Sequence, residues 1–200
     1  MAPSVITYTG RMSRWEPNAR ARLERAALDL FAERGYDAAT VAEIAERAGL
    51  TKRTFFRYFT DKREVLFGGQ EMLSRALTEG VTAAPGSATP LDAVGSALEA
   101  VAPLFDLNRL DIVRQRQSVI AANVELQERE LLKGATLARA MADGFRARDL
   151  PEPVVHVAAE LGLLALRRTF ARWAAAENER KFTDLAQEVL AELKSATTRL

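Results

Sequence analysis

Hydrophobic residues recur along most of the chain at the three- and four-residue spacing of an α-helix, and alternating β-branched runs are missing. In the first such segment, the apolar positions are Leu23, Ala27, Leu30 and Phe31. This helix is predicted to begin at Pro17, because proline is favoured at the first helical position, and to end at Gly35. Strong helix formers also dominate the remainder of the chain, so the pattern predicts an all-α protein.

The next elements follow from the same spacing. Two short helices are predicted at about 41–48 and 52–59, and a longer one begins near Asp61 and runs toward Gly80. Residues 83–90, rich in Pro, Ser and Gly, form the clearest break in the chain. Beyond this break, helices are predicted at 91–105, 109–122, 125–148, 154–176 and 182–197. The predicted architecture is a small N-terminal helical unit joined to a larger helical bundle.

The pattern between residues 40 and 51 predicts two helices joined by a tight turn. Thr40 and Thr51 are suited to cap the first and second helix. Ala45 is small, so the second helix can cross closely above the first. Gly49 stands where the turn needs a positive φ, which glycine tolerates without strain.

The second of these helices has a face for the core and a face for a partner. Phe55 and Phe59 are four residues apart and are predicted to seat the helix, while Arg53 and Arg57 point away from them. A recognition helix for DNA needs this combination, because arginine and threonine can contact phosphates and base edges. The predicted DNA-contacting residues are Thr40, Thr51, Lys52, Arg53, Thr54, Phe56, Arg57, Tyr58 and Lys62. The alternative is a helical hairpin whose basic face is only solvated.

Residues 17–67 resemble the DNA-binding part of the TetR family of transcriptional regulators. The matching positions are Thr40, Ile44, Ala45, Ala48, Gly49, Leu50, Thr51, Thr54, Phe55, Phe56, Tyr58, Phe59, Lys62, Val65 and Leu66. Phe56 stands where the family usually has Tyr, so the phosphate hydrogen bond of that Tyr is lost, and Tyr58 stands where the family usually has His. The run Arg-Thr-Phe-Phe-Arg-Tyr-Phe is similar to an actinobacterial branch that includes regulators associated with mycofactocin.

Charge and composition narrow the classes of function. The chain has 28 Lys and Arg against 27 Asp and Glu, a net charge of +1, so any affinity for DNA comes from local placement of charge. An architectural DNA-binding protein remains an alternative, but it would be expected to show a larger basic excess and would not need the long helical remainder. We therefore expect a sequence-specific regulator.

An enzyme is the third alternative, and no motif supports it. The sequence has no phosphate-binding Gly loop, no Gly-x-Ser-x-Gly and no His-Glu-x-x-His. It has no cysteine, and His156 is the only histidine, so we expect no metal site and no cofactor. The N-terminus lacks a secretory signal, and no stretch approaches the roughly 18 apolar residues of a membrane span, which predicts a cytoplasmic protein without a membrane partner.

The resemblance implies a ligand-responsive regulator, most commonly a repressor, that is released from DNA by a small apolar or amphipathic effector. The expected organisation is a flexible arm at 1–16, a helix-turn-helix domain at 17–67, and a ligand-binding and dimerisation domain at 68–200. Arg11 and Arg14 of the arm either reach a minor groove or belong to a disordered leader. The expected effector-lining residues are Phe105, Val113, Gln117, Met141, Phe145, Phe170 and Trp173. The alternative is that these residues only fill a close-packed core.

We also predict a homodimer through about 153–197 that binds a near-palindromic operator. Two stripes at helical spacing are suited to a four-helix interface. They consist of Ala158, Gly162, Ala165 and Thr169, and of Phe182, Ala186, Val189 and Leu193. The alternative is that both stripes face the bundle of their own chain.

Overall fold

The computed structural model describes residues 18–175 and 178–198, and within these ranges it contains helices and turns but no strand. The helices are α1 (Ala19–Arg34), α2 (Val41–Arg47), α3 (Lys52–Tyr58), α4 (Glu64–Phe67), α5 (Gln70–Thr82), α6 (Pro90–Val101), α7 (Leu110–Ala121), α8 (Val124–Arg146), α9 (Glu152–Ala174) and α10 (Phe182–Thr197), with short 3₁₀ turns at Ala102–Leu104 and Leu107–Arg109. The all-α prediction is confirmed. The predicted arm at 1–16 and the helix start at Pro17 lie outside the described residues.

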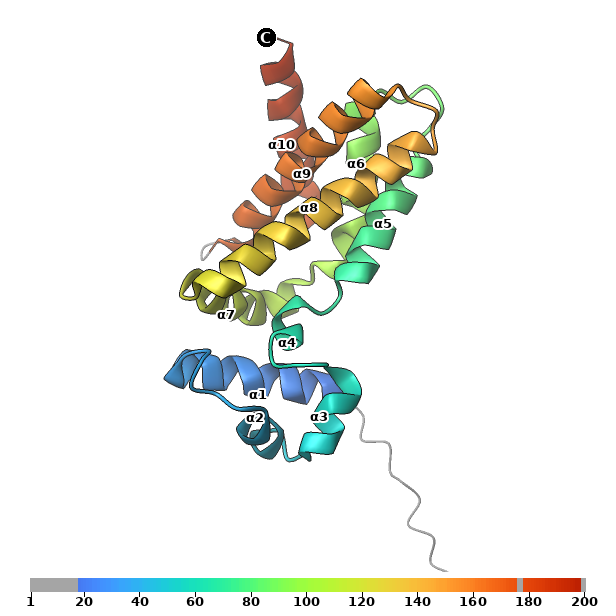
Figure 1. Ribbon diagram of the computed structural model, residues 1–200. Coiled ribbons are helices and arrows are strands. Elements are labelled where there is room, and N and C mark those ends of the chain that lie inside the picture. The colour runs from blue at the N-terminus through green and yellow to red at the C-terminus, as the bar shows by residue number, and fades with distance from the viewer. Residues whose placement is uncertain (1–17, 176–177, 199–200) are drawn as a thin grey trace, which may run out of the picture.

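Figure 1 shows two groups of helices with α7 between them. Helices α1, α2 and α3 form one end of the molecule, and α5, α6, α8, α9 and α10 form the bundle at the other end. Helix α4 is the covalent link, and α7 lies next to α1. No helix among the described residues is long and apolar enough to cross a membrane.

The single helix predicted from Asp61 to Gly80 is wrong, because the chain breaks between α4 and α5. Gly69 has a φ of 83°, a left-handed conformation that turns the backbone before α5 begins. Asp61 does act as a cap, since its Oδ1 atom accepts the backbone N–H groups of Arg63 at 2.7 Å and Glu64 at 3.1 Å. The break lets α4 stay on the N-terminal core while α5 turns into the bundle.

One hydrophobic core joins the N-terminal helices to the bundle. It contains the apolar faces of α1 to α4, and it also contains Val119 and Ile120 of α7 and Leu126 of α8. Leu126 is completely buried in this shared core. The division predicted between residues 67 and 68 therefore falls at the junction of α4 and α5, while apolar packing continues across it.

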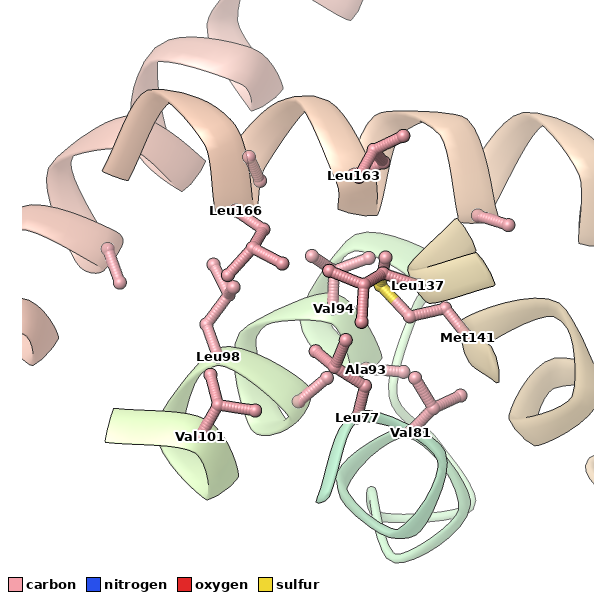
Figure 2. Packing of buried hydrophobic residues seen from close by; sticks show 14 of the residues in the cluster. Leu77, Val81, Ala93, Val94, Leu98, Val101, Leu137, Met141, Leu163 and Leu166 are labelled. Carbon is pink, nitrogen blue, oxygen red and sulfur yellow. The ribbon is translucent and has the colours of Figure 1, made fainter. Parts of the chain in front are cut away.

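A second core fills the bundle, in which α5 packs against both α6 and α8, and Figure 2 shows its side chains meeting from several helices. Figure 2 labels Leu77, Val81, Ala93, Val94, Leu98, Val101, Leu137, Met141, Leu163 and Leu166. The helices approach closely, because a Cβ atom on Gly80 would lie 2.6 Å from the Cα of Ala97, and one on Gly144 would lie 2.8 Å from the Cβ of Val81. Substitution of either glycine would therefore force α5 away from a neighbouring helix.

Both stripes predicted to form the dimer interface lie inside the bundle of their own chain, so this part of the prediction is wrong. Every member of the two stripes is buried, including Thr169 and Val189. The exposed apolar face of α9 is a different one. It consists of Val154, Val157 and Leu164 together with the half-buried Leu161, and we call it the α9 stripe.

Leu126→Ala tests the shared core. We expect this change to lower the free energy of unfolding by about 2–5 kcal/mol, because it leaves a cavity where α8 meets the N-terminal helices. Urea denaturation followed by circular dichroism measures the effect. The matched control is Leu132→Ala on the same helix, where the side chain is 61% exposed, and we expect a change within about 0.5 kcal/mol. Equal effects of the two substitutions would contradict the shared core.

Candidate nucleic-acid interface

Helices α2 and α3 begin at threonine caps, as the sequence predicts. The Thr40 hydroxyl accepts the N–H of Glu43 at 3.3 Å, and the Glu43 carboxylate accepts the N–H of Thr40 at 2.9 Å, which completes a capping box. These hydrogen bonds from Thr40 lower the pKa of Glu43. At α3, the Thr51 hydroxyl accepts the N–H of Thr54 at 3.1 Å. Both threonines are exposed at the free end of the molecule.

Gly49 gives the turn between α2 and α3 its shape. Its φ is 64°, so the left-handed conformation predicted for this position is present. A Cβ atom here would also lie 2.8 Å from the Nη2 atom of Arg22. Arg22 donates from that nitrogen to the carbonyl oxygen of Ala48, which ties the turn to α1. The sequence offered no signal for this contact, because Arg22 lies far from the turn along the chain.

Helix α3 is seated on its apolar side. Phe55 and Phe59 are buried with their ring centroids 5.4 Å apart, and the Phe56 ring meets Phe55 edge-on at 5.6 Å. Phe56 itself is 50% exposed, so it lies on the rim of the seat. This arrangement holds the opposite side of α3 at a fixed orientation toward solvent.

The outer side of α3 carries three exposed cations. Lys52, Arg53 and Arg57 have no carboxylate within ion-pair distance in the described part of the chain. Arg53 and Arg57, with Thr54 and Phe56 between them, line a hollow on this side. The outer side of α3 is therefore a surface of uncompensated positive charge.

Tyr58 lies at the margin of this surface. The Arg57 guanidinium packs over the Tyr58 ring, 4.9 Å from its centroid, and donates to the phenol oxygen at 3.2 Å. The contact holds the Arg57 side chain beside α3, so its charge is kept near the hollow.

Two arginines of α1 and α2 are paired, in contrast to the cations of α3. Arg47 binds Glu33 through two hydrogen bonds of 2.6 and 2.7 Å, and these bonds lower the pKa of Glu33. Arg34 binds Glu43 at 2.9 Å. These two arginines are therefore neutralised within the chain, whereas Lys52, Arg53 and Arg57 of α3 are not.

Lys62 lies apart from the outer surface of α3. Its ammonium group donates to the carbonyl oxygens of Tyr36 at 2.8 Å, Asp37 at 3.2 Å and Ala39 at 3.2 Å. It also lies 4.3 Å from the centroid of the Tyr36 ring. These contacts occupy its three N–H donors, so the geometry favours a structural role in holding the turn between α1 and α2 over the predicted phosphate contact.

A cavity of about 540 Å³ lies where α5, α7, α8 and α9 meet. Phe105, Val113 and Phe170 of the predicted set are on its wall. The other members of that set are Gln117, Met141, Phe145 and Trp173, and they are not. Met141, Phe145 and Trp173 are buried in the core instead, and the half-buried Gln117 lies outside the lining.

Trp173 shows why the predicted set and the wall differ. Its ring is 5.3 Å from Phe105 and 6.0 Å from Phe170, so it packs behind the two phenylalanines that face the cavity. Helical spacing places Phe170 and Trp173 near each other on α9, but only the tertiary packing decides which rings face the cavity.

The polar part of the wall was missed by the sequence analysis, which assigned it to Gln117. Arg116 of α7, Glu130 and Lys133 of α8, and Arg167 of α9 all line the cavity. Arg116 binds Glu130 at 2.6 Å. Burial lowers the pKa of Lys133 to about 8, with a further contribution from Arg116. No local pattern signals this cluster, because its members come from three helices.

Comparison with known proteins identifies the N-terminal helices. Residues 24–67 match the family described as bacterial regulatory proteins, TetR family, which covers α2, α3, α4 and most of α1. These N-terminal residues are therefore similar in sequence to the DNA-binding part of TetR-family regulators. Over 82 residues the chain is 38% identical to the transcriptional regulator TcmR of Streptomyces glaucescens. That alignment covers 41% of this chain and 36% of TcmR, so the chain spans about a third of this relative's length.

Solved structures share the whole fold. Among them are Thermus thermophilus FadR with lauroyl-CoA (22% identity, 88% of this chain and 93% of the other, TM-score 0.52), a transcriptional regulator from Aquifex aeolicus (18%, 89% and 99%, 0.55) and SmeT with triclosan (17%, 89% and 90%, 0.60). The family model describes regulatory proteins, and its match is confined to the helix-turn-helix region of this chain. Beyond residue 67, the solved structures show that the helical fold is shared.

Lys62→Met tests the structural role of Lys62. Loss of three hydrogen bonds to carbonyl oxygens is expected to lower the free energy of unfolding by about 1–3 kcal/mol, because these oxygens are left without their donor. Urea denaturation measures this loss, with the exposed Lys52→Met as the matched control, expected within about 0.5 kcal/mol. The salt dependence of DNA binding should stay unchanged in Lys62→Met. If the slope of log affinity against log salt concentration becomes smaller by about one unit, the predicted phosphate contact of Lys62 is supported instead.

Proposed function

We propose that this protein is a cytoplasmic, ligand-responsive transcriptional repressor of the TetR family that binds a near-palindromic operator as a homodimer. The observation that supports DNA recognition most directly is the set of unpaired cations on the outer side of α3. Lys52, Arg53 and Arg57 stay without a carboxylate partner while Arg47 and Arg34 are paired. A rigid helix with free positive charge and exposed hydroxyls is suited to enter the major groove.

Within this proposal the residues divide by the part of DNA they reach. Arg53 and Thr54 face the hollow of α3 and are assigned to base edges, and Lys52 and Arg57 flank the groove. Thr40, Thr51 and Tyr58 are assigned to phosphates, since they surround α3 at the exposed end of the molecule. Phe56 has no hydrogen-bonding group and is assigned an apolar contact at the rim.

The homodimer is proposed to form through α9. The α9 stripe, with Val154, Val157, Leu161 and Leu164, repeats at intervals of three, four and three residues, which suits packing against a second helix. Val154 and Val157 also line an apolar groove beside the start of α6. The outer side of α10 is polar, so α9 supplies the apolar centre of this interface.

The cavity is proposed to hold the effector. Two proteins of the same fold form complexes with small molecules, FadR with lauroyl-CoA and SmeT with triclosan. Arg116 gives the cavity of this protein a route to the N-terminal helices, because its Nε atom donates to the carbonyl oxygen of Leu66 at the end of α4. Its guanidinium also lies 5.2 Å from the centroid of the Phe67 ring. A ligand that moves Arg116 would shift α4, and operator and effector would then weaken each other equally.

An architectural DNA-binding role is less well supported. Such a protein needs neither an internal cavity nor a link from the cavity to α4, and this chain has both. Binding that depends only on phosphate contacts also fades fastest as salt is raised, so the two roles can be separated by experiment.

Arg53→Ala tests the base contact. Selection of bound duplexes from a random pool defines the operator, and gel-shift assays with variant duplexes then measure specificity. We expect Arg53→Ala to cost about 1–3 kcal/mol and to relax the preference at one operator position. Arg139→Ala on the exposed side of α8 is the control and should bind normally. A uniform loss on all duplexes would make Arg53 a phosphate contact. If the selection yields no preferred operator sequence, the proposed role as a regulator is contradicted.

Val157→Glu tests the α9 interface. A carboxylate in an apolar helix–helix contact is costly to bury, so we expect sedimentation to show a monomer at micromolar concentration, where the wild type is a dimer. The control is Val124→Glu on α8, where the exposed valine lies outside the α9 stripe; Val157 is 62% and Val124 70% exposed. A Val157→Glu protein that remains dimeric, or a monomeric wild type, would contradict this interface.

A further inference from the structure

The cavity carries more positive charge than it neutralises. Three cations and one carboxylate line its wall, namely Arg116, Lys133, Arg167 and Glu130. Glu130 is paired with Arg116 at 2.6 Å. Within residues 18–175 and 178–198, neither Lys133 nor Arg167 has a carboxylate within ion-pair distance. The cavity therefore has an excess of two positive charges in the absence of a ligand.

Lys133 is half-buried in largely apolar surroundings, whereas Arg167 lies at the exposed edge of the cavity. The rest of the wall includes Phe105, Val113 and Phe170. Burial lowers the pKa of Lys133 to about 8, which shows that water does not fully compensate its charge. A half-buried cation without a partner costs stability, so a ligand that supplies a negative charge gains energy from Lys133, and the exposed Arg167 adds a second cation beside it.

Gly134 allows Arg167 to reach this place. A Cβ atom on Gly134 would overlap the Nη2 atom of Arg167, so the guanidinium of α9 lies directly across the backbone of α8. Lys133 precedes Gly134 on α8, and both cations line the same cavity. The bare backbone at Gly134 thus brings charges from two helices to one wall.

We infer that the effector is an amphipathic anion whose acidic group, a carboxylate or sulfonate, binds between Lys133 and Arg167 while its apolar body packs against Phe105, Val113 and Phe170. This inference rests on the proposed function only in calling the ligand an effector. The acidic group compensates the excess positive charge of the cavity, and the apolar body of the ligand packs against the aromatic and aliphatic wall. A cation of the same shape is rejected by the two unpaired charges, and a neutral molecule gains nothing from them.

A matched pair of fluorescent probes tests the acidic group. 8-Anilinonaphthalene-1-sulfonate and N-phenyl-1-naphthylamine have the same aromatic body, but only the first carries an acidic group, and both brighten in apolar sites. Titration of the full-length protein is expected to show tighter binding of the sulfonate. Lys133→Met and Arg167→Met should each weaken the sulfonate about tenfold or more, and should leave the neutral probe within about twofold.

Two further variants separate charge from folding. Gly134→Ala keeps every charge, strengthens the helix and displaces the Arg167 guanidinium, so it should weaken the sulfonate while thermal stability is retained. Arg139→Met removes a cation from α8 outside the cavity, and the ratio of the two dissociation constants should match that of the wild type.

The outcomes separate this inference from the proposed function. If Lys133→Met and Arg167→Met change both probes equally, or neither, the anionic effector is overturned, whereas operator binding without ligand is a separate measurement. The wild type could select no operator and still discriminate between the probes through Lys133 and Arg167. That result would support the anion site and contradict the proposed role as a regulator.

Discussion

The hydrophobic core shared by α1 to α4, α7 and α8 decides where the recognition helix lies relative to the rest of the molecule. Ile120 and Leu126 reach this core from α7 and α8, and Phe55 seats α3 in the same core. The bundle and the DNA-contacting surface are therefore not independent bodies on a linker. Helix α7 packs directly against α1 in this core, so the positions of α7 and of the N-terminal helices depend on each other.

Some cations of the described residues are paired with carboxylates, and two groups that are not paired lie on the two surfaces assigned a ligand. Arg47 is paired with Glu33, and Lys194 with Asp92. In contrast, Lys52, Arg53 and Arg57 on α3 and Lys133 and Arg167 in the cavity have no carboxylate partner among the described residues. Arg116 connects the cavity to the N-terminal helices, since it lines the cavity and donates to the carbonyl oxygen of Leu66 at the end of α4.

The helix-turn-helix was predictable because its determinants are local. The Thr40 and Thr51 caps, the positive φ of Gly49 and the Phe55 and Phe59 seat each involve residues within a few positions of one another. The break between α4 and α5 was also marked locally by two adjacent glycines, but the apolar spacing through them favoured one continuous helix. The role of Lys62 had no such mark, because the carbonyl oxygens it bonds belong to residues 36–39, more than 20 positions away.

By itself, the sequence determined the all-α class, the position of most helices and the helix-turn-helix, since spacing, capping and turn chemistry act over a few residues. Only the tertiary structure decided which face of a helix is inside. Helix α9 has apolar residues on both sides, and helical spacing alone does not show that Ala165 is buried while Val157 is exposed. The cluster of charged residues in the cavity also depends on the tertiary structure, because Arg116, Lys133 and Arg167 come together only when three separate helices pack.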